Sequence, residues 1–117
     1  MADDKPKQIP VVFYRTSSGT EVVRDWLQGL DADDRQAIGL DLMRVQFRWP
    51  VGMPLCRSLK DGLWEVRTTL PSKRIARTLF CIHDDAIIVL SGFIKKTQKT
   101  PDEELALARR RMREFLD

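Results

Sequence analysis

Three β-rich runs joined by short connections fill much of the second half of the chain, and no other feature restricts the fold as strongly. They span residues 63–69, 75–82 and 87–94, and β-branched and aromatic residues are frequent in all three. The segment 70–74 between the first two runs is short enough for a hairpin connection. The region is therefore predicted to form an antiparallel sheet.

Charged side chains lie within these runs, on one face of the predicted sheet. Because side chains alternate between the two faces of a strand, Glu65 and Arg67 share a face opposite to that of Trp64. Trp64 is expected in the core, with base stacking as the alternative. The hairpin brings Arg67 near Arg77, and two like charges across paired strands repel unless a negative group lies between them. We therefore predict that the two arginines form an anion-binding site. The alternative is a structural ion pair with Glu65.

The rest of the chain supplies three helices and further extended segments. The fold class is α+β, with a strand, a helical hairpin, a mostly antiparallel sheet and a C-terminal helix. The length fits a single domain, expected over residues 9–117 after a flexible segment at residues 1–8. Local patterns predict a strand over residues 9–15, helices over 21–30 and 31–49, an extended segment over 55–60, and a last helix from Pro101 to Phe115.

Positive charge is concentrated in the region of the predicted sheet. The whole chain has a net charge of +3, yet residues 57–99 contain nine Lys and Arg against four Asp and Glu. This distribution favours a polyanion site on one surface. A basic surface that only faces solvent gives the same counts, so charge alone leaves both interpretations open.

Several classes of function lack the residues that they need. The sequence has no Walker motif, Gly-rich dinucleotide loop, nucleophile elbow or zinc-ligand spacing, so no metal or cofactor is expected. His83 is the one histidine, which excludes a two-histidine ribonuclease mechanism in a monomer. Cys56 and Cys81 lack CxxC spacing and are expected to be buried thiols. With no signal core and no membrane span, the chain is expected in the cytoplasm.

Three segments together resemble the phage-derived, HigB-like branch of the RelE/ParE toxin superfamily. They are Gly62–Arg67, Ala76–Phe80 and, above all, Gly92–Pro101, which reads Gly-Phe-Ile-Lys-Lys-Thr-Gln-Lys-Thr-Pro before a basic helix. The resemblance spans nearly the whole chain from Ile9. It implies a RelE-like fold with a curled antiparallel sheet, and the toxin of a type II toxin–antitoxin pair that cuts mRNA on the ribosome. The implied partners are the ribosome, mRNA and a helix-turn-helix antitoxin, with DNA reached only through the antitoxin complex and with no membrane contact.

The resemblance also implies roles for individual residues. Arg67 and Arg77 match the sheet arginines of the superfamily, Glu65 matches an acidic position of this branch, and Lys96 falls near the basic residue after the last strand. Leu63 and Glu65 stand where RelE has lysines, and the last helix has no match for its C-terminal tyrosine. We expect Glu65 to accept the proton of a 2′-hydroxyl, Arg67 and Arg77 to bind the phosphate, and Lys96 to assist the leaving oxygen. The flanking RNA would be held by Lys60, Lys73, Arg74, Lys95 and Lys99.

Two other functions remain compatible with the sequence. A ParE-like toxin shares the fold but inhibits DNA gyrase by binding it, and therefore needs no general base. A degenerate member of the superfamily would bind partners without being toxic. Growth arrest with intact transcripts would indicate the first of these, and absence of toxicity would indicate the second.

Overall fold

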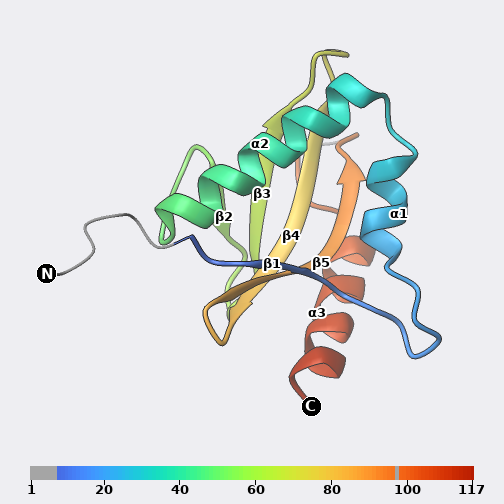
Figure 1. Ribbon diagram of the computed structural model, residues 1–117, viewed down its shortest axis with the longest axis vertical. Coiled ribbons are helices and arrows are strands. Elements are labelled where there is room, and N and C mark those ends of the chain that lie inside the picture. Colours follow the sequence, from blue (N-terminus) through green and yellow to red (C-terminus); the bar gives the residue numbers. More distant parts are fainter. Residues whose placement is uncertain (1–7, 97) are drawn as a thin grey trace, which may run out of the picture.

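The computed structural model describes residues 8–96 and 98–117, which form a five-stranded sheet and three helices (Figure 1). Thr97 and most of the predicted flexible segment, residues 1–7, lie outside the described residues. Within the described ranges no helix has the length and apolar character needed to cross a bilayer. In chain order the elements are β1 (Val11–Phe13), α1 (Val22–Gln28), α2 (Ala32–Arg48), β2 (Cys56–Ser58), β3 (Trp64–Thr69), β4 (Ile75–His83), β5 (Ala86–Ile94) and α3 (Asp102–Leu116).

The sheet is an antiparallel meander with one short strand added at each edge. β3, β4 and β5 pair antiparallel as predicted, and the order across the sheet is β1-β5-β4-β3-β2, which confirms the α+β class. β1 pairs parallel with β5. β2 pairs with β3 only over Cys56–Ser58, and the backbone N–H of Arg67 then donates to the carbonyl of Leu55 at 3.1 Å. The last residues of β3 therefore lie at an open edge of the sheet.

Several elements are shorter than the sequence predicts. β1 does not extend over residues 9–15, because the backbone of Ile9 is hydrogen-bonded to Gln46 on α2. β2 does not extend over residues 55–60, because Lys60 and Asp61 adopt positive φ angles of 74° and 54° that turn the chain into β3. The helices α1 and α2 each begin one residue later than predicted and end one or two residues earlier.

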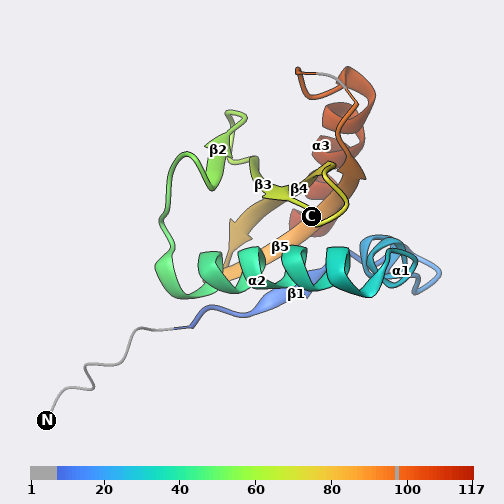
Figure 2. The ribbon, with the colours of Figure 1, turned by 90° about the horizontal axis from the view of Figure 1, so that it is seen from above.

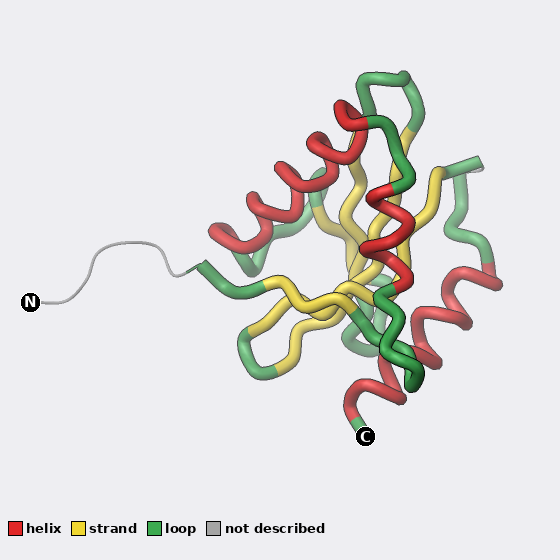
Figure 3. Tube along the Cα trace, turned by 45° about the vertical axis from the view of Figure 1, so that its right-hand side comes forward, coloured by secondary structure: helices red, strands yellow, loops and turns green. Residues whose placement is uncertain are grey.

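Helices cover both faces of the sheet. Figure 2 places α1 and α2 on one side of the strands and α3 on the other, and Figure 3 shows the hairpin of α1 and α2 lying across the strands, apart from α3. Alternation along β4 produces the two layers, since Phe80 packs under the hairpin whereas Leu79 packs under α3 with Ala108. Trp64 lies on the hairpin side, where its ring meets Trp49 edge to face with centroids 5.0 Å apart. Its expected position in the core is confirmed.

Both cysteines are buried and free, as predicted. Burial raises the pKa of the Cys56 thiol to about 11, and the nearby carboxylate of Asp41 acts in the same direction. Burial alone raises the pKa of the Cys81 thiol to about 11. Both groups therefore remain protonated at neutral pH and contribute to packing.

Gly92 on β5 allows the ring of Trp26 on α1 to lie directly against the sheet. A Cβ at position 92 would lie only 2.5 Å from Cζ3 and 2.7 Å from Cε3 of that ring. We expect Gly92→Ala to lower the free energy of unfolding by about 1–3 kcal/mol, because the ring has to move off the strand. Gly39→Ala is the matched control, since it adds a Cβ on the exposed side of α2 with nothing within 4 Å. It should stabilise the protein by about 0.5–1 kcal/mol, and urea unfolding of both variants checks the opposite signs.

The turn between β3 and β4 is tied to the start of α2 by the buried carboxylate of Asp34. This carboxylate accepts hydrogen bonds from the backbone N–H of Ser72 at 3.2 Å and from its hydroxyl at 2.8 Å, and it pairs with Arg74 at 3.2 Å. Burial acts to raise the pKa of Asp34, but the bonds from Ser72 and Arg74 outweigh it and hold the pKa below its ordinary value of 3.8.

This carboxylate should make stability depend on pH in the acid range. A lowered pKa in the folded state means that the ionised group stabilises the fold above the unfolded-state pKa, and that this contribution is lost as the pH falls through the folded-state value. The difference in free energy of unfolding between the wild type and Asp34→Asn should therefore be largest near pH 7 and shrink below about pH 4. Urea unfolding of both proteins at pH 7 and pH 3 measures it. A difference that is the same at both pH values would contradict the assignment.

Candidate functional site

The charged side chains predicted to share one face of the sheet do so, on the side away from the helical hairpin of α1 and α2. Arg67 on β3 lies directly opposite Arg77 on β4 in the antiparallel register, and Glu65 lies opposite Leu79. On the other side of β3, Glu65 also lies opposite Arg57 of β2. One face of three adjacent strands therefore carries three arginines around a single carboxylate, and the approach of Arg67 and Arg77 predicted from the hairpin is confirmed.

Glu65 and Arg77 form a buried cluster with Thr100. Each of the two charged side chains is only 3% exposed, and Glu65 Oε1 lies 3.7 Å from a terminal nitrogen of Arg77. The hydroxyl of Thr100 donates to the same Oε1 at 2.9 Å and accepts from Arg77 at 2.7 Å. The second terminal nitrogen of Arg77 donates to the carbonyl of Gln98 at 2.8 Å. Arg77 thus links β4 to Glu65 on β3 and to the segment that leads into α3.

This cluster contains the ion pair that the sequence left open as the alternative to anion binding. Both terminal nitrogens of Arg77 are already bonded within the protein, and its Nε is buried without a partner among the described residues. Glu65 differs, because Oε2 has no hydrogen bond in the described part of the chain and is not among its buried unpartnered atoms. Since Glu65 also lines a pocket, its second oxygen remains accessible there.

Arg67 and Lys95 lie beside this cluster with their charges accessible. Arg67 is exposed, and its guanidinium has no ion-pair partner among the described residues. Partial burial of Lys95, followed by the nearby charges of Arg67 and Arg77, lowers the pKa of its ammonium, whereas Glu65 acts to raise it. The amide oxygen of Gln98 accepts from the Lys95 ammonium at 3.3 Å. Lys95 therefore lies within electrostatic reach of all three charged side chains.

A pocket of about 690 Å³ lies at the open edge of β3, between α2 and β2. We call it the basic pocket. Arg44 pairs with Asp41, and Arg77 pairs with Glu65. The other three arginines have no ion-pair partner in the part of the chain that the structure describes, so the pocket has an excess of positive charge. Its charged lining residues are Asp41, Arg44, Arg48, Arg57, Glu65, Arg67 and Arg77.

Three of these lining arginines were not predicted from the sequence as site residues. Arg44 and Arg48 lie four residues apart in the second half of α2. The periodic pattern of that helix indicates its apolar face but not the role of its arginines. Arg57 belongs to a strand too short to have a clear alternating pattern. The available signal was the spacing of Arg44 and Arg48 on one helix face, but only the folded chain places that face beside β3.

The other predicted basic residues lie outside the basic pocket. Lys96 is exposed and lines a second pocket, of about 640 Å³, with Lys73, Arg74 and Lys95, where β4 begins and β5 ends. Arg74 is paired with Asp34. Lys60 lies in the turn between β2 and β3, where its carbonyl accepts from Arg109 at 3.5 Å, and Lys99 lies 3.9 Å from Asp102. These residues are therefore divided between two ends of the sheet.

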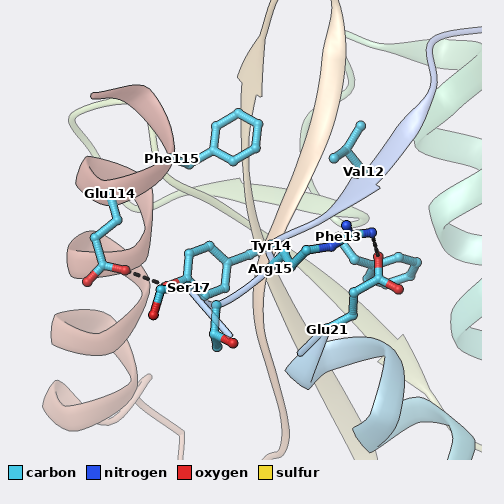
Figure 4. A pocket seen from close by; sticks show the side chains of 9 residues that line it. Val12, Phe13, Tyr14, Arg15, Ser17, Glu21, Glu114 and Phe115 are labelled. Carbon is cyan, nitrogen blue, oxygen red and sulfur yellow. Dashed lines mark hydrogen bonds and ion pairs between the residues drawn. The ribbon is translucent and has the colours of Figure 1, made fainter. Parts of the chain in front are cut away.

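The only tyrosine of the chain, Tyr14, lines another pocket than the basic pocket (Figure 4). Tyr14 lines a pocket of about 770 Å³ beside β1 and donates its hydroxyl to Glu114 on α3. This hydrogen bond, together with burial, raises the pKa of Tyr14. Thr100 precedes the first turn of α3 and Glu114 lies in its last turn, and a helix of 15 residues is about 22 Å long. Tyr14 therefore does not replace the RelE tyrosine at the Glu65 cluster.

Comparison with known families supplies one match. Residues 25–113, about three quarters of the chain, match the profile described as Phage derived protein Gp49-like (DUF891). The matched range begins within α1 and ends within α3, so it contains the basic pocket and the Glu65–Arg77–Thr100 cluster. A search of curated proteins gives no match.

Proposed function

The chain belongs to the phage-derived Gp49-like family, which is toxin-like, and from this premise we propose that it is the toxin of a type II toxin–antitoxin pair and an endoribonuclease. We assign it to the HigB-like branch of the RelE/ParE superfamily. Its substrate in this proposal is mRNA on the ribosome, in the cytoplasm. Its neutralising partner is a helix-turn-helix antitoxin, through which alone it reaches DNA.

The nuclease proposal rests on Arg67, which has no ion-pair partner among the described residues, and on the accessible carboxylate oxygen of Glu65 beside it. The planar guanidinium group of an arginine can donate hydrogen bonds to two phosphate oxygens at once. The carboxylate and Arg67 project from the same face of β3, two residues apart, so a phosphodiester bound by Arg67 would have its ribose near Glu65. Arg48 and Arg57 extend the positive charge of the pocket along the path that a polyanion would follow.

The proposed reaction is a transesterification within one nucleotide. Glu65 Oε2 takes the proton of the 2′-hydroxyl, and the 2′-oxygen forms a bond to the adjacent phosphorus. The bond from phosphorus to the 5′-oxygen of the next nucleotide breaks, and that oxygen takes a proton from a lysine. The products are a 2′,3′-cyclic phosphate and a 5′-hydroxyl. Arg67 stabilises the charge that develops on the phosphate oxygens, while Arg77 holds Glu65 in position through the contacts already described.

Lys95 is better placed than Lys96 to donate the last proton. Partial burial of Lys95, followed by the charges of Arg67 and Arg77, lowers the pKa of its ammonium, and an ammonium with a lowered pKa is a stronger acid. Both lysines line the second pocket, but Lys95 is half-buried and lies within electrostatic reach of Glu65 and both arginines, whereas Lys96 is exposed. We therefore propose Lys95 for the role that the sequence assigned to Lys96, and leave Lys96 a contact with flanking RNA.

Induced expression in bacteria, with mapping of transcript 5′ ends, tests the function and this assignment together. The wild type should arrest growth and produce new mRNA ends that carry a 5′-hydroxyl. Lys95→Met should lower the frequency of these ends by about 100-fold or more, as expected for loss of a general acid. Lys96→Met should lower it by about threefold or less, as expected for loss of one backbone contact.

The outcomes separate the alternatives. Growth arrest with intact transcripts and damaged DNA would replace the nuclease with a gyrase inhibitor, and absence of arrest would indicate a non-toxic binding protein. Cleavage that survives Lys95→Met but is lost in Lys96→Met would return the acid role to Lys96.

A further inference from the structure

The helix α2 has apolar side chains on its outer face as well as on the face that packs on the sheet. Leu40, Met43 and Phe47 are 42%, 42% and 44% exposed. Their spacing of three and four residues places them on one side of a helix. Ile38 and Val45, which are fully buried, belong to the opposite side. We call Leu40, Met43 and Phe47 the outer stripe.

Within the described residues, none of the three side chains of the outer stripe belongs to either apolar core. A surface helix normally has one apolar side toward the core and polar residues on the other. In Figure 2 strands β3, β4 and β5 lie on one side of α2, and the three side chains of the outer stripe are exposed among the described residues. Large contiguous apolar patches on a protein surface mark interaction sites, whereas scattered single apolar residues do not, and the three side chains of the outer stripe are neighbours on the helix.

The surroundings of the outer stripe are positively charged on the side of the basic pocket. Arg44 and Arg48 lie on α2 between the stripe and the pocket that they line. Beyond them, Met53 is 75% exposed in the loop that lines the same pocket. The apolar surface and the basic pocket therefore form one continuous region, with two arginines at their boundary.

We propose that the outer stripe binds an amphipathic helix of an acidic partner protein, and that carboxylates of this helix lie over Arg44, Arg48 and the entrance of the basic pocket. Apolar residues three and four positions apart are the pattern that a second helix packs against. Arg48, which has no ion-pair partner among the described residues, favours acidic residues beside the apolar anchors of that helix, whereas Arg44 is already paired with Asp41. The regulatory part of this inference depends on the proposed function, because a helix bound here would block the entrance for RNA.

Two other occupants fit the region less well. A second copy of the chain in a twofold-symmetric contact would place the same surface on both sides, so the arginines of the two copies would approach each other without compensating acids. RNA would satisfy the arginines but would leave the aliphatic side chains of Leu40 and Met43 without apolar contact.

The test uses the protein encoded next to this gene, expressed together with the full chain and purified with it. The dissociation constant of that complex is measured for the wild type, for Leu40→Gln with Phe47→Gln, and for Leu116→Gln. Glutamine retains helix propensity, and Leu116 is an equally exposed apolar residue on α3, 47% exposed. We expect the double variant to weaken binding by about 100-fold, the control to change it by less than about threefold, and the wild-type affinity to fall with rising salt.

The same variants are expressed without the partner to read the proposed nuclease separately. Transcript cleavage that persists in the double variant, together with loss of neutralisation by the partner, supports the inference. Unchanged binding by the double variant, or no binding by the wild type, overturns it whether or not the chain cuts RNA.

Two outcomes would assign the outer stripe to another occupant. If the wild type is a dimer in light scattering and the double variant is not, the stripe binds a second copy of the chain. If the double variant loses cleavage but binds the partner unchanged, the stripe binds the substrate. Binding that persists in a wild type without nuclease activity would overturn only the proposed function.

Discussion

Arg67→Ala is expected to lower the rate of transcript cleavage by about 100-fold or more while leaving the stability of the fold within about 0.5 kcal/mol of the wild type. Removing one group that stabilises developing charge typically costs two to three orders of magnitude in rate. The side chain of Arg67 is exposed and has no ion-pair partner among the described residues, so its truncation leaves no buried charge uncompensated. Mapping of 5′ ends after induction measures the first quantity, and urea unfolding measures the second.

Two further variants make this result specific. Arg67→Lys retains the positive charge but loses the bidentate hydrogen bonding to phosphate. Its cleavage rate should therefore lie between those of Arg67→Ala and the wild type. Arg24→Ala removes another exposed arginine, on α1, where its partner is the partly exposed Glu21. This variant should cleave transcripts at the wild-type rate. If Arg67→Ala cuts at the wild-type rate while remaining folded, phosphate binding by this face of the sheet is excluded.

The sequence was sufficient to predict the antiparallel pairing of β3, β4 and β5, because that pattern is local. Alternation within residues 63–69 and 75–82 correctly predicted which side chains share a face, and the short connection correctly predicted that Arg67 faces Arg77. Lengths of the edge strands were harder to predict, because they depend on contacts with distant residues. Gln46 on α2 holds Ile9 away from the sheet, and no pattern around Ile9 indicates it.

The candidate site was predicted in part for the same reason. Period-two alternation identified Glu65, Arg67 and Arg77, but the sequence did not indicate which of two arginines is buried. Burial of Arg77 follows from the position of Thr100, whose hydroxyl contacts both Arg77 and Glu65 and which is 23 residues away from Arg77. The contribution of α2 to the basic pocket likewise depends on how the hairpin crosses the sheet, which no spacing within α2 specifies.

Arg77→Ala, in contrast to Arg67→Ala, is expected to lower the free energy of unfolding by about 3–5 kcal/mol. The substitution leaves the carboxyl group of Glu65 only 3% exposed and without its cation, and breaking a buried pair from one side has costs of this size. It also removes the bonds that hold Thr100 and Gln98 before α3. Since small domains are stable by only about 5–15 kcal/mol, much of the variant should unfold near growth temperature.

Comparing Arg77→Ala with Arg67→Ala distinguishes an effect on the stability of the fold from an effect on the cleavage reaction. A double-mutant cycle with Glu65→Gln and Arg77→Met should show that the pair together costs less stability than the sum of the single changes, because neither charge is then left alone. Loss of toxicity in Arg77→Ala therefore cannot by itself identify a phosphate ligand, since an unfolded toxin is also inactive. If Arg77→Ala unfolds at the same urea concentration as the wild type, the ion pair contributes little to stability, and the direct role in phosphate binding predicted from the sequence becomes the better explanation of its position.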